Sequence, residues 1–436
     1  MTGLEVGAFV VVGALGLILL RVPVGVALGL SAFAGAATLL PMPAAISLMS
    51  RVPYEFAASW EYAAVPLFLL MGAIVVRANM AEGIFAFLGR ALRGVPGGLA
   101  IATNFAGAGF GAATGSSLAT TVAIGRLATP QMLRARYDPG LATAVTACAG
   151  TLAALIPPSI PLIVYGILAE QSVARLFFAG LVPGLLTAFV YAAMISVRCW
   201  LNPTLAPPLP HDETPLPRDP GLFALPLLAI IILGGIYFGW FSPSQAGAVG
   251  AVAALVLALL RGNFGWAELR AAVGDAARQS SAILFVAIGA FMLTRTMALT
   301  GLPGALADLV EFWSISPLVL ILAASLIFVL LGMILDPLGV MLLSVAVLLP
   351  VFERQGFDLI WLGIIIVKYV EIGLITPPVG LNVFAAKSVA PKGIALTTIF
   401  RGVLWFLLAE VVVMTLLLSM PSLTLWLPDL VFGVRR

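Results

Sequence analysis

Charged side chains are scarce in this chain. Only 9% of its 436 residues are Asp, Glu, Lys or Arg, and 62% are hydrophobic. Because ordinary soluble domains carry about 25% charged residues, this composition excludes a soluble globular protein. About a dozen apolar blocks approach the roughly 20 residues that a membrane-spanning helix needs. The clearest blocks are 6–20, 22–40, 223–240, 246–260, 318–335 and 403–418. The sequence therefore predicts an all-α polytopic membrane protein.

Other scarce residue types exclude several classes of activity. None of the three lysines follows a Gly-x-x-x-x-Gly segment of the kind that binds phosphate, which argues against ATP hydrolysis. The only histidine, His211, lies in a polar loop, and there is no Cys/His cluster typical of a metalloenzyme. Cys148 and Cys199 are too few for a disulfide framework. We expect a protein that is not an enzyme and that takes its energy from an ion gradient or from another subunit.

Two proline pairs interrupt apolar blocks where a spanning helix would otherwise continue. They are Pro157-Pro158 and Pro377-Pro378. Proline removes a backbone donor and clashes with the preceding turn, so each helix must break there. In a bilayer such a break is tolerated only where the freed backbone groups face protein or a water-filled cavity. Two matched breaks therefore predict two half-sites that face one cavity.

The segment 104–121 consists almost entirely of small residues. Small residues allow helices to approach closely within a membrane. The same composition also suits the tip of a hairpin whose backbone contacts a ligand, because Gly115 lies between Thr114 and the pair Ser116-Ser117. We favour the hairpin and keep close helix packing as the alternative.

The chain repeats itself after about 220 residues. At this shift Ser116 aligns with Asp336 and the two proline pairs align with each other. Three further identities are Pro130 with Pro350, Arg134 with Arg354, and Asp138 with Asp358. Matched interruptions in two halves are typical of transporters built from structural repeats, with the site at the repeat interface. Whether the repeats are inverted or parallel stays open.

The repeat divides the chain into three parts. Residues 1–201 form the first half, with a hairpin near 104–130 and a broken helix at 157–158. Residues 202–220 form a polar linker. Residues 221–436 form the second half, with a hairpin near 317–350 and a broken helix at 377–378. All these bounds are predictions from the sequence.

Four charged residues lie in apolar surroundings, where a charge is costly and often functional. Arg295 suits two-pronged binding of a carboxylate, or it is an interfacial arginine that reaches the lipid headgroups. Asp336 holds a substrate or cation, or it only caps a broken helix. Lys368 and Glu371 are three residues apart, so an ion pair between them is expected.

The second break offers oxygen atoms for a small cation. Free carbonyl groups near Gly373 and Thr376 are suited to a cation such as sodium. Alternatively, the Thr376 hydroxyl bonds to its own helix.

Nearly the whole chain resembles the large membrane subunit (DctM type) of TRAP transporters, the tripartite ATP-independent periplasmic carriers of bacteria and archaea. The resemblance rests on 65–72, Gly115-Ser116-Ser117, 137–140, 156–161, 332–337, 371–382 and Lys387-Ser388. It implies an elevator-type transporter with about 11 spans, two re-entrant hairpins and two broken helices. It also implies a multi-pass protein of the bacterial inner membrane that couples uptake to sodium.

The family further implies partners and cargo. The partners are a small four-span membrane subunit (DctQ type) and a periplasmic substrate-binding protein (DctP type). The cargo is a small organic anion, such as a C4-dicarboxylate, sialic acid or another carboxylate. No organic cofactor is implied, and Na+ is the coupling ion.

The resemblance also assigns site residues. One sodium site would use Thr114, Ser116, Ala153, Ile156 and Pro158. The second would use Gly332, Gly373, Thr376 and Val379. Cargo would contact Arg295, Asp336, Ser116 and Ser117.

The sequence departs from the family at several positions near these sites. Thr114 stands where serine is more usual, and Ala149-Gly150 where two glycines are common. Lys368-Tyr369 replaces an apolar residue and asparagine. These departures affect the cation geometry and the cargo rather than the family.

We therefore expect a sodium-driven importer subunit for small organic anions. One alternative is a stand-alone ion-coupled anion transporter of the same broad fold. Another is a channel or scaffold subunit that does not transport. The sequence does not name the cargo.

Overall fold

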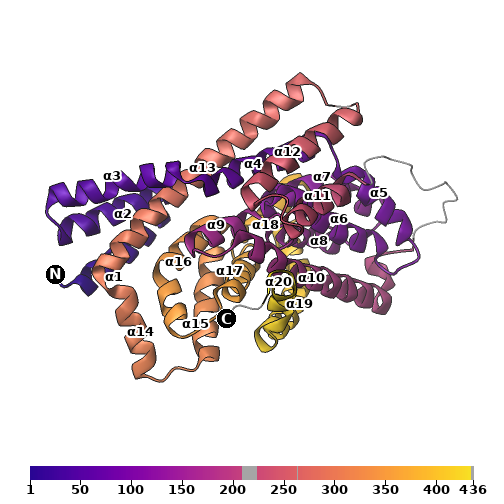
Figure 1. Cartoon of the computed structure of the whole chain (residues 1–436). Coiled ribbons are helices and arrows are strands. Elements are labelled where there is room, and N and C mark those ends of the chain that lie inside the picture. The colour runs from indigo at the N-terminus through magenta and orange to yellow at the C-terminus, as the bar shows by residue number, and fades with distance from the viewer. Residues whose placement is uncertain (209–222, 263, 434–436) are drawn as a thin grey trace.

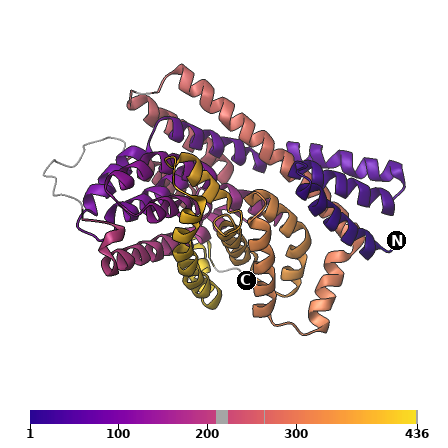
Figure 2. The same ribbon diagram turned by 180° about the vertical axis from the view of Figure 1, so that it is seen from behind.

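The computed structural model describes residues 1–208, 223–262 and 264–433. Within these ranges the chain forms twenty α-helices and three short 3-10 helices, and it has no strand. Figures 1 and 2 show these helices from opposite sides. The all-α prediction is confirmed. His211 and most of the predicted linker 202–220 lie outside the described residues.

Several helices are long and apolar enough to cross a membrane. In the described ranges six meet both criteria: Trp60–Arg77 (a 3-10 turn, Trp60–Ala63, followed by α4, Ala64–Arg77), α10 (Val173–Leu201), α12 (Pro243–Leu260), α13 (Trp266–Thr300), α16 (Pro337–Arg354) and α19 (Leu396–Ser419). Shorter apolar helices include α1 (Gly3–Leu19), α2 (Val24–Leu39), α11 (Ala224–Tyr237), α15 (Pro317–Gly332) and α20 (Ser422–Phe432). This set of helices is consistent with a polytopic membrane protein. The number of about eleven spans stays a prediction.

Two helical hairpins occupy the positions expected from the sequence. The first joins α6 (Gly98–Thr114) to α7 (Ser117–Arg134), and the second joins α15 to α16. The first chain reversal uses Gly115, whose φ of +61° favours glycine. Ser116 and Asp336 then cap α7 and α16, because their side chains accept hydrogen bonds from the backbone N–H groups of Ala119 and Gly339.

Both proline pairs interrupt helices, as predicted. α8 (Pro139–Thr151) continues as a 3-10 turn (Leu152–Ala154), breaks at the first pair and resumes as α9 (Ile160–Leu168). α17 (Leu359–Gly373) breaks at the second pair and resumes as α18 (Leu381–Val389). The proline–proline peptide bond is cis in both.

The bounds of the helices follow the 220-residue shift along most of the chain. α7 and α16 span 117–134 and 337–354, and α8 and α17 begin at 139 and 359. Outside the site, α2 and α12 correspond in the same way, as do α5 (Ala81–Ala91) and α14 (Leu302–Phe312). The halves differ where α3 (Met42–Ala58) and α4 are separate helices but their counterpart, α13, is continuous. In Figure 1, α13 runs between α1–α3 and the rest of the molecule.

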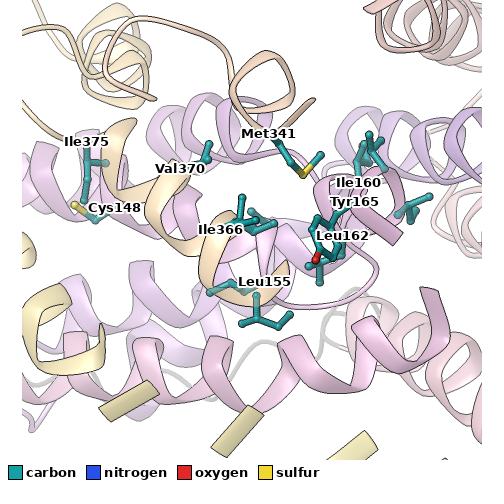
Figure 3. Packing of buried hydrophobic residues seen from close by; sticks show 14 of the residues in the cluster. Cys148, Leu155, Ile160, Leu162, Tyr165, Met341, Ile366, Val370 and Ile375 are labelled. Carbon is teal, nitrogen blue, oxygen red and sulfur yellow. The ribbon is translucent and has the colours of Figure 1, made fainter. Parts of the chain in front are cut away.

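Helices of the two halves pack against each other at the centre of the molecule. α7 packs against α18 and α9 against α16, so each hairpin touches the broken helix of the other half. Figure 3 shows buried residues of both halves in one cluster, among them Leu155 and Tyr165 with Ile366 and Ile375. The Tyr165 hydroxyl donates a 2.7 Å hydrogen bond to the carbonyl oxygen of Leu359. The site is therefore positioned by both halves together.

Two glycines set the crossing of α15 and α17. A Cβ atom at Gly373 would lie 2.8 Å from the Gly332 Cα atom and 2.9 Å from the Val329 carbonyl oxygen. Backbone atoms in a packed helix cannot move aside as the end of a flexible side chain can. The close approach of the two helices therefore requires glycine at this position.

We predict that Gly373→Ala destabilises the protein by about 1–3 kcal/mol, the usual cost of overpacking. The melting temperature of the purified protein in detergent measures this effect. Gly274→Ala, in the exposed part of α13, is the matched control because a Cβ atom there meets nothing within 4 Å. Equal melting temperatures for the two variants would contradict the prediction.

Candidate functional site

A cavity of about 160 Å³ lies where the two hairpin tips meet. The first tip contributes 115–118 and the second contributes 336–338, while Ile160 and Pro161 come from the resumed helix α9. Glu371 of α17 lines it as well, and the remaining lining residues are Leu69, Gln279, Ile283. The structure thus brings together Ser116, Ser117 and Asp336, three of the four residues predicted to contact cargo.

Three helices begin at this cavity. They are α7 from Ser117, α9 from Ile160 and α16 from Pro337. A helix N-terminus carries a partial positive charge and backbone N–H groups without partners inside the helix, so it attracts anions. The ends of α7 and α9 make one part of the cavity suited to a carboxylate, whereas the end of α16 is already capped by the Asp336 carboxylate. No basic side chain is among the described residues that line the cavity.

Glu371 is the main residue of the cavity that the sequence did not predict. Its side chain is buried, with 1% of the residue exposed. The Ser117 hydroxyl donates a 2.7 Å hydrogen bond to its Oε1 atom. Within the described part of the chain its Oε2 atom has no hydrogen-bond partner. The signal in the sequence was a carboxylate just before a proline pair, at the position that aligns with the uncharged Thr151.

The predicted ion pair between Lys368 and Glu371 is wrong. The Lys368 ammonium group instead lies 2.7 Å from Oε1 of Glu410 on α19, and the Tyr191 hydroxyl of α10 donates to the same oxygen. Residues three apart on a helix can meet, but here they point to different neighbouring helices. Lys368 and Glu371 each pair with a residue far away in the sequence. The spacing of three residues between them does not predict such partners. The Lys368–Glu410 pair is almost fully buried.

The residues of the first predicted sodium site lie close together. The tip residue Gly115 approaches the first break so closely that a Cβ atom there would lie 3.0 Å from the Pro158 carbonyl oxygen. Thr114 is buried, and its hydroxyl lies 2.7 Å from that of Thr120. Within the described ranges, no backbone N–H donates to the carbonyl oxygens of Ile156 or Pro158. Ala153 packs against Gly111 of α6. Carbonyl and hydroxyl oxygens are thus gathered where the resemblance places a cation.

The second predicted sodium site is only partly assembled. Gly332 and Gly373 are in backbone contact where α15 crosses α17. The Thr376 hydroxyl donates a 2.6 Å hydrogen bond to the Ile372 carbonyl oxygen, as in the alternative considered for this residue. Val379 is half-buried. The first break is buried throughout, whereas Pro378 of the second break is exposed.

The structure does not bring Arg295 to the cavity. Its Nη2 atom lies 3.5 Å from Oε2 of Glu55, and the two side chains are 59% and 57% exposed. The cargo-binding role of Arg295 stays a prediction from the resemblance. The geometry favours the alternative, an interfacial arginine.

Removing one partner of the buried pair should be far more harmful than removing both. We predict that Glu410→Ala costs about 3–5 kcal/mol, because Lys368 keeps its buried charge without a partner. The double variant Lys368→Met with Glu410→Leu should recover most of this loss. Thermal unfolding of the three proteins in detergent provides the comparison. A double variant no more stable than the single one would show that the pair does not account for the loss.

An exposed ion pair contributes about 0–1 kcal/mol, so Arg295→Ala should leave the uptake that the resemblance implies within about threefold of that of the unmodified protein. Glu55→Gln, which breaks the same contact from the other side, is the control. Loss of uptake in Arg295→Ala alone, with the protein still folded and assembled, would instead support direct contact with cargo.

The chain is similar to a known transporter family. Residues 11–423 match the family model described as the DctM component of the tripartite ATP-independent periplasmic transporter. A C4-dicarboxylate TRAP transporter large permease protein, DctM, of Pseudomonas aeruginosa is 33% identical, and the alignment covers 92% of this chain and 93% of that protein. The ectoine/5-hydroxyectoine large permease protein UehC of Ruegeria pomeroyi is 34% identical over 85% of this chain and 86% of that one.

Two further comparisons concern partners and fold. The isethionate TRAP transporter permease protein DctMQ of Oleidesulfovibrio alaskensis is 28% identical, and the alignment covers 92% of this chain but 63% of that protein. Among solved structures, the YdaH transporter of Alcanivorax borkumensis is similar, with a TM-score of 0.61 and 15% identity. That alignment covers 88% of this chain and 91% of the other. At this identity the similarity concerns the fold alone.

Proposed function

Because the chain belongs to the family of DctM components of tripartite ATP-independent periplasmic transporters, we propose that it carries out sodium-coupled import of a small organic acid. In this proposal it is a multi-pass protein of a bacterial inner membrane. It forms the path for cargo as the large permease subunit. Its relatives are transporter permeases and not enzymes, and the proposed coupling ion is Na+.

The cavity between the hairpin tips is the observation that supports this proposal most strongly. It is formed by two hairpins and two interrupted helices that pack across the halves of the chain. The N-termini of α7 and α9 meet there, which suits a carboxylate group. We propose that Ser116, Ser117 and Asp336 contact the cargo in this cavity.

The oxygens around the first break support the sodium sites. Sodium is a small hard cation, and unwound backbone carbonyls at membrane depth are typical of its sites in transporters. We propose Thr114, Ser116, Ala153, Ile156 and Pro158 for one ion. Gly332, Gly373, Thr376 and Val379 are proposed for a second ion.

An elevator movement would carry this cavity across the membrane. The hairpins and broken helices pack on one another around the cavity. α2, α4, α12 and α13 form a second group, in which α13 packs against α2 and α4, and α12 against α4. We propose that the first group moves relative to the second.

We further propose two partners, a small membrane subunit of DctQ type and a periplasmic binding protein of DctP type that delivers cargo. The name DctMQ of the longer relative and its additional length support the membrane partner.

Uptake into proteoliposomes that contain the complete transporter should require an inward sodium gradient. In Thr114→Val, the loss of one hydroxyl should raise the sodium concentration for half-maximal uptake roughly tenfold, which corresponds to about 1.4 kcal/mol. Thr103→Val, the same change three turns earlier in α6, is the matched control, since its hydroxyl bonds the Leu99 carbonyl oxygen. Uptake that is indifferent to sodium would refute the coupling.

A further inference from the structure

We propose that the cavity selects a cargo with a protonated nitrogen in addition to its carboxylate, and that Glu371 binds this nitrogen. The inference rests on the proposed function, because it specifies the class of organic acid that the same cavity takes. The cargo would be a small zwitterion, with an ammonium or amidinium group, rather than a dicarboxylate dianion.

The first argument is the unpaired oxygen of Glu371. The residue is 1% exposed, and only its Oε1 atom is hydrogen-bonded, to the Ser117 hydroxyl. Oε2 is buried without a partner among the described residues, although Glu371 lines the cavity. A buried carboxylate is costly unless a cation or a donor compensates it. A cargo N–H group that enters the cavity would supply both the charge and the donor.

The second argument is that, among the described residues, no basic side chain forms an ion pair with Glu371. Lys368 lies one turn away on the same helix, but its ammonium group is bound to Glu410. Arg295 pairs with Glu55 outside the cavity. Within the described ranges no Lys, Arg or His lines the cavity. A cation or a proton that enters the cavity would therefore compensate this carboxylate, and we assign this role to the cargo nitrogen.

The third argument is the distribution of charge around the cavity. The N-termini of α7 and α9 can receive one cargo carboxylate, whereas that of α16 is already capped by the Asp336 carboxylate. Asp336 and Glu371 are both acidic and both line the cavity. A second cargo carboxylate would meet these groups without any basic side chain to offset the repulsion. A protonated nitrogen in the same place is attracted by both.

The experiment compares organic acids that differ only in nitrogen. The purified complex of the large and small subunits is titrated by calorimetry with γ-aminobutyrate against butyrate and with aspartate against succinate, and ectoine is added as an amidinium probe. The same compounds are then tested for uptake with the binding protein present. We expect the preferred compound to carry nitrogen, with at least about tenfold tighter binding than its nitrogen-free partner. Equal or tighter binding of the nitrogen-free acids overturns the inference.

Variants identify the carboxylate responsible. Glu371→Gln keeps the size of the side chain and an acceptor for Ser117, and it should abolish the preference for nitrogen. Asp336→Asn, which retains a capping side chain, should reduce the preference and serves if Glu371→Gln does not fold. Glu353→Gln, at the exposed end of α16, is the matched control and should preserve it.

Two other occupants of the Glu371 site have distinct signatures. If Glu371 binds sodium or a proton, Glu371→Gln changes the sodium or pH dependence of uptake for both members of each pair and leaves their ratio intact. That result overturns the inference while the proposed import stands. If no carboxylic acid of the panel binds or is taken up, the inference is overturned, while the sodium-dependence test of the preceding subsection decides the proposed function.

Discussion

The structure depends on one constraint, the need of backbone N–H and C=O groups for partners inside a bilayer. A helix that crosses without interruption satisfies them itself, but a helix broken by two prolines cannot. Here both breaks lie where the two halves of the chain pack on each other. The hairpin tip at Gly115 lies against the Pro158 carbonyl oxygen, so it closes the space beside the first break. The cavity and the caps of α7 and α16 lie where the hairpin tips meet α9, next to the first interruption.

The same constraint explains why the helices around the site pack so closely. α15 crosses α17 with glycine on both sides, and Gly107 and Gly111 of α6 lie directly against Ala149 and Ala153. Small residues bring backbones into contact and leave no room for lipid. Close helix packing, one of the two interpretations of segment 104–121, is therefore confirmed for α6, while a tip that contacts a ligand stays a prediction. α6 packs closely, while its end at Gly115 lines the cavity.

Much of the fold could be predicted because its features leave local marks in the sequence. Proline pairs mark the breaks, small residues mark the first hairpin, and the 220-residue shift relates the helices of the two halves. The same shift aligns Ser116 with Asp336, and it predicts that these two residues occupy the facing hairpin tips. Ion-pair partners that lie on different helices are set by tertiary packing, so no local pattern in the sequence predicts them. Glu410 lies 42 residues beyond Lys368 on another helix. Arg295 of α13 lies beside Glu55 of α3, in the other half of the chain.

Duplication alone would give the two halves of the cavity the same charge, but the aligned residues differ. Ser116 and Thr151 in the first half are neutral, whereas their counterparts Asp336 and Glu371 are acidic. All the formal negative charge among the residues that line the cavity therefore comes from one of two related halves. A cavity of two identical halves would accept a molecule in either of two orientations. This one has a polar axis, so a polar molecule that enters it has one favourable orientation, which stays fixed to the second half of the chain.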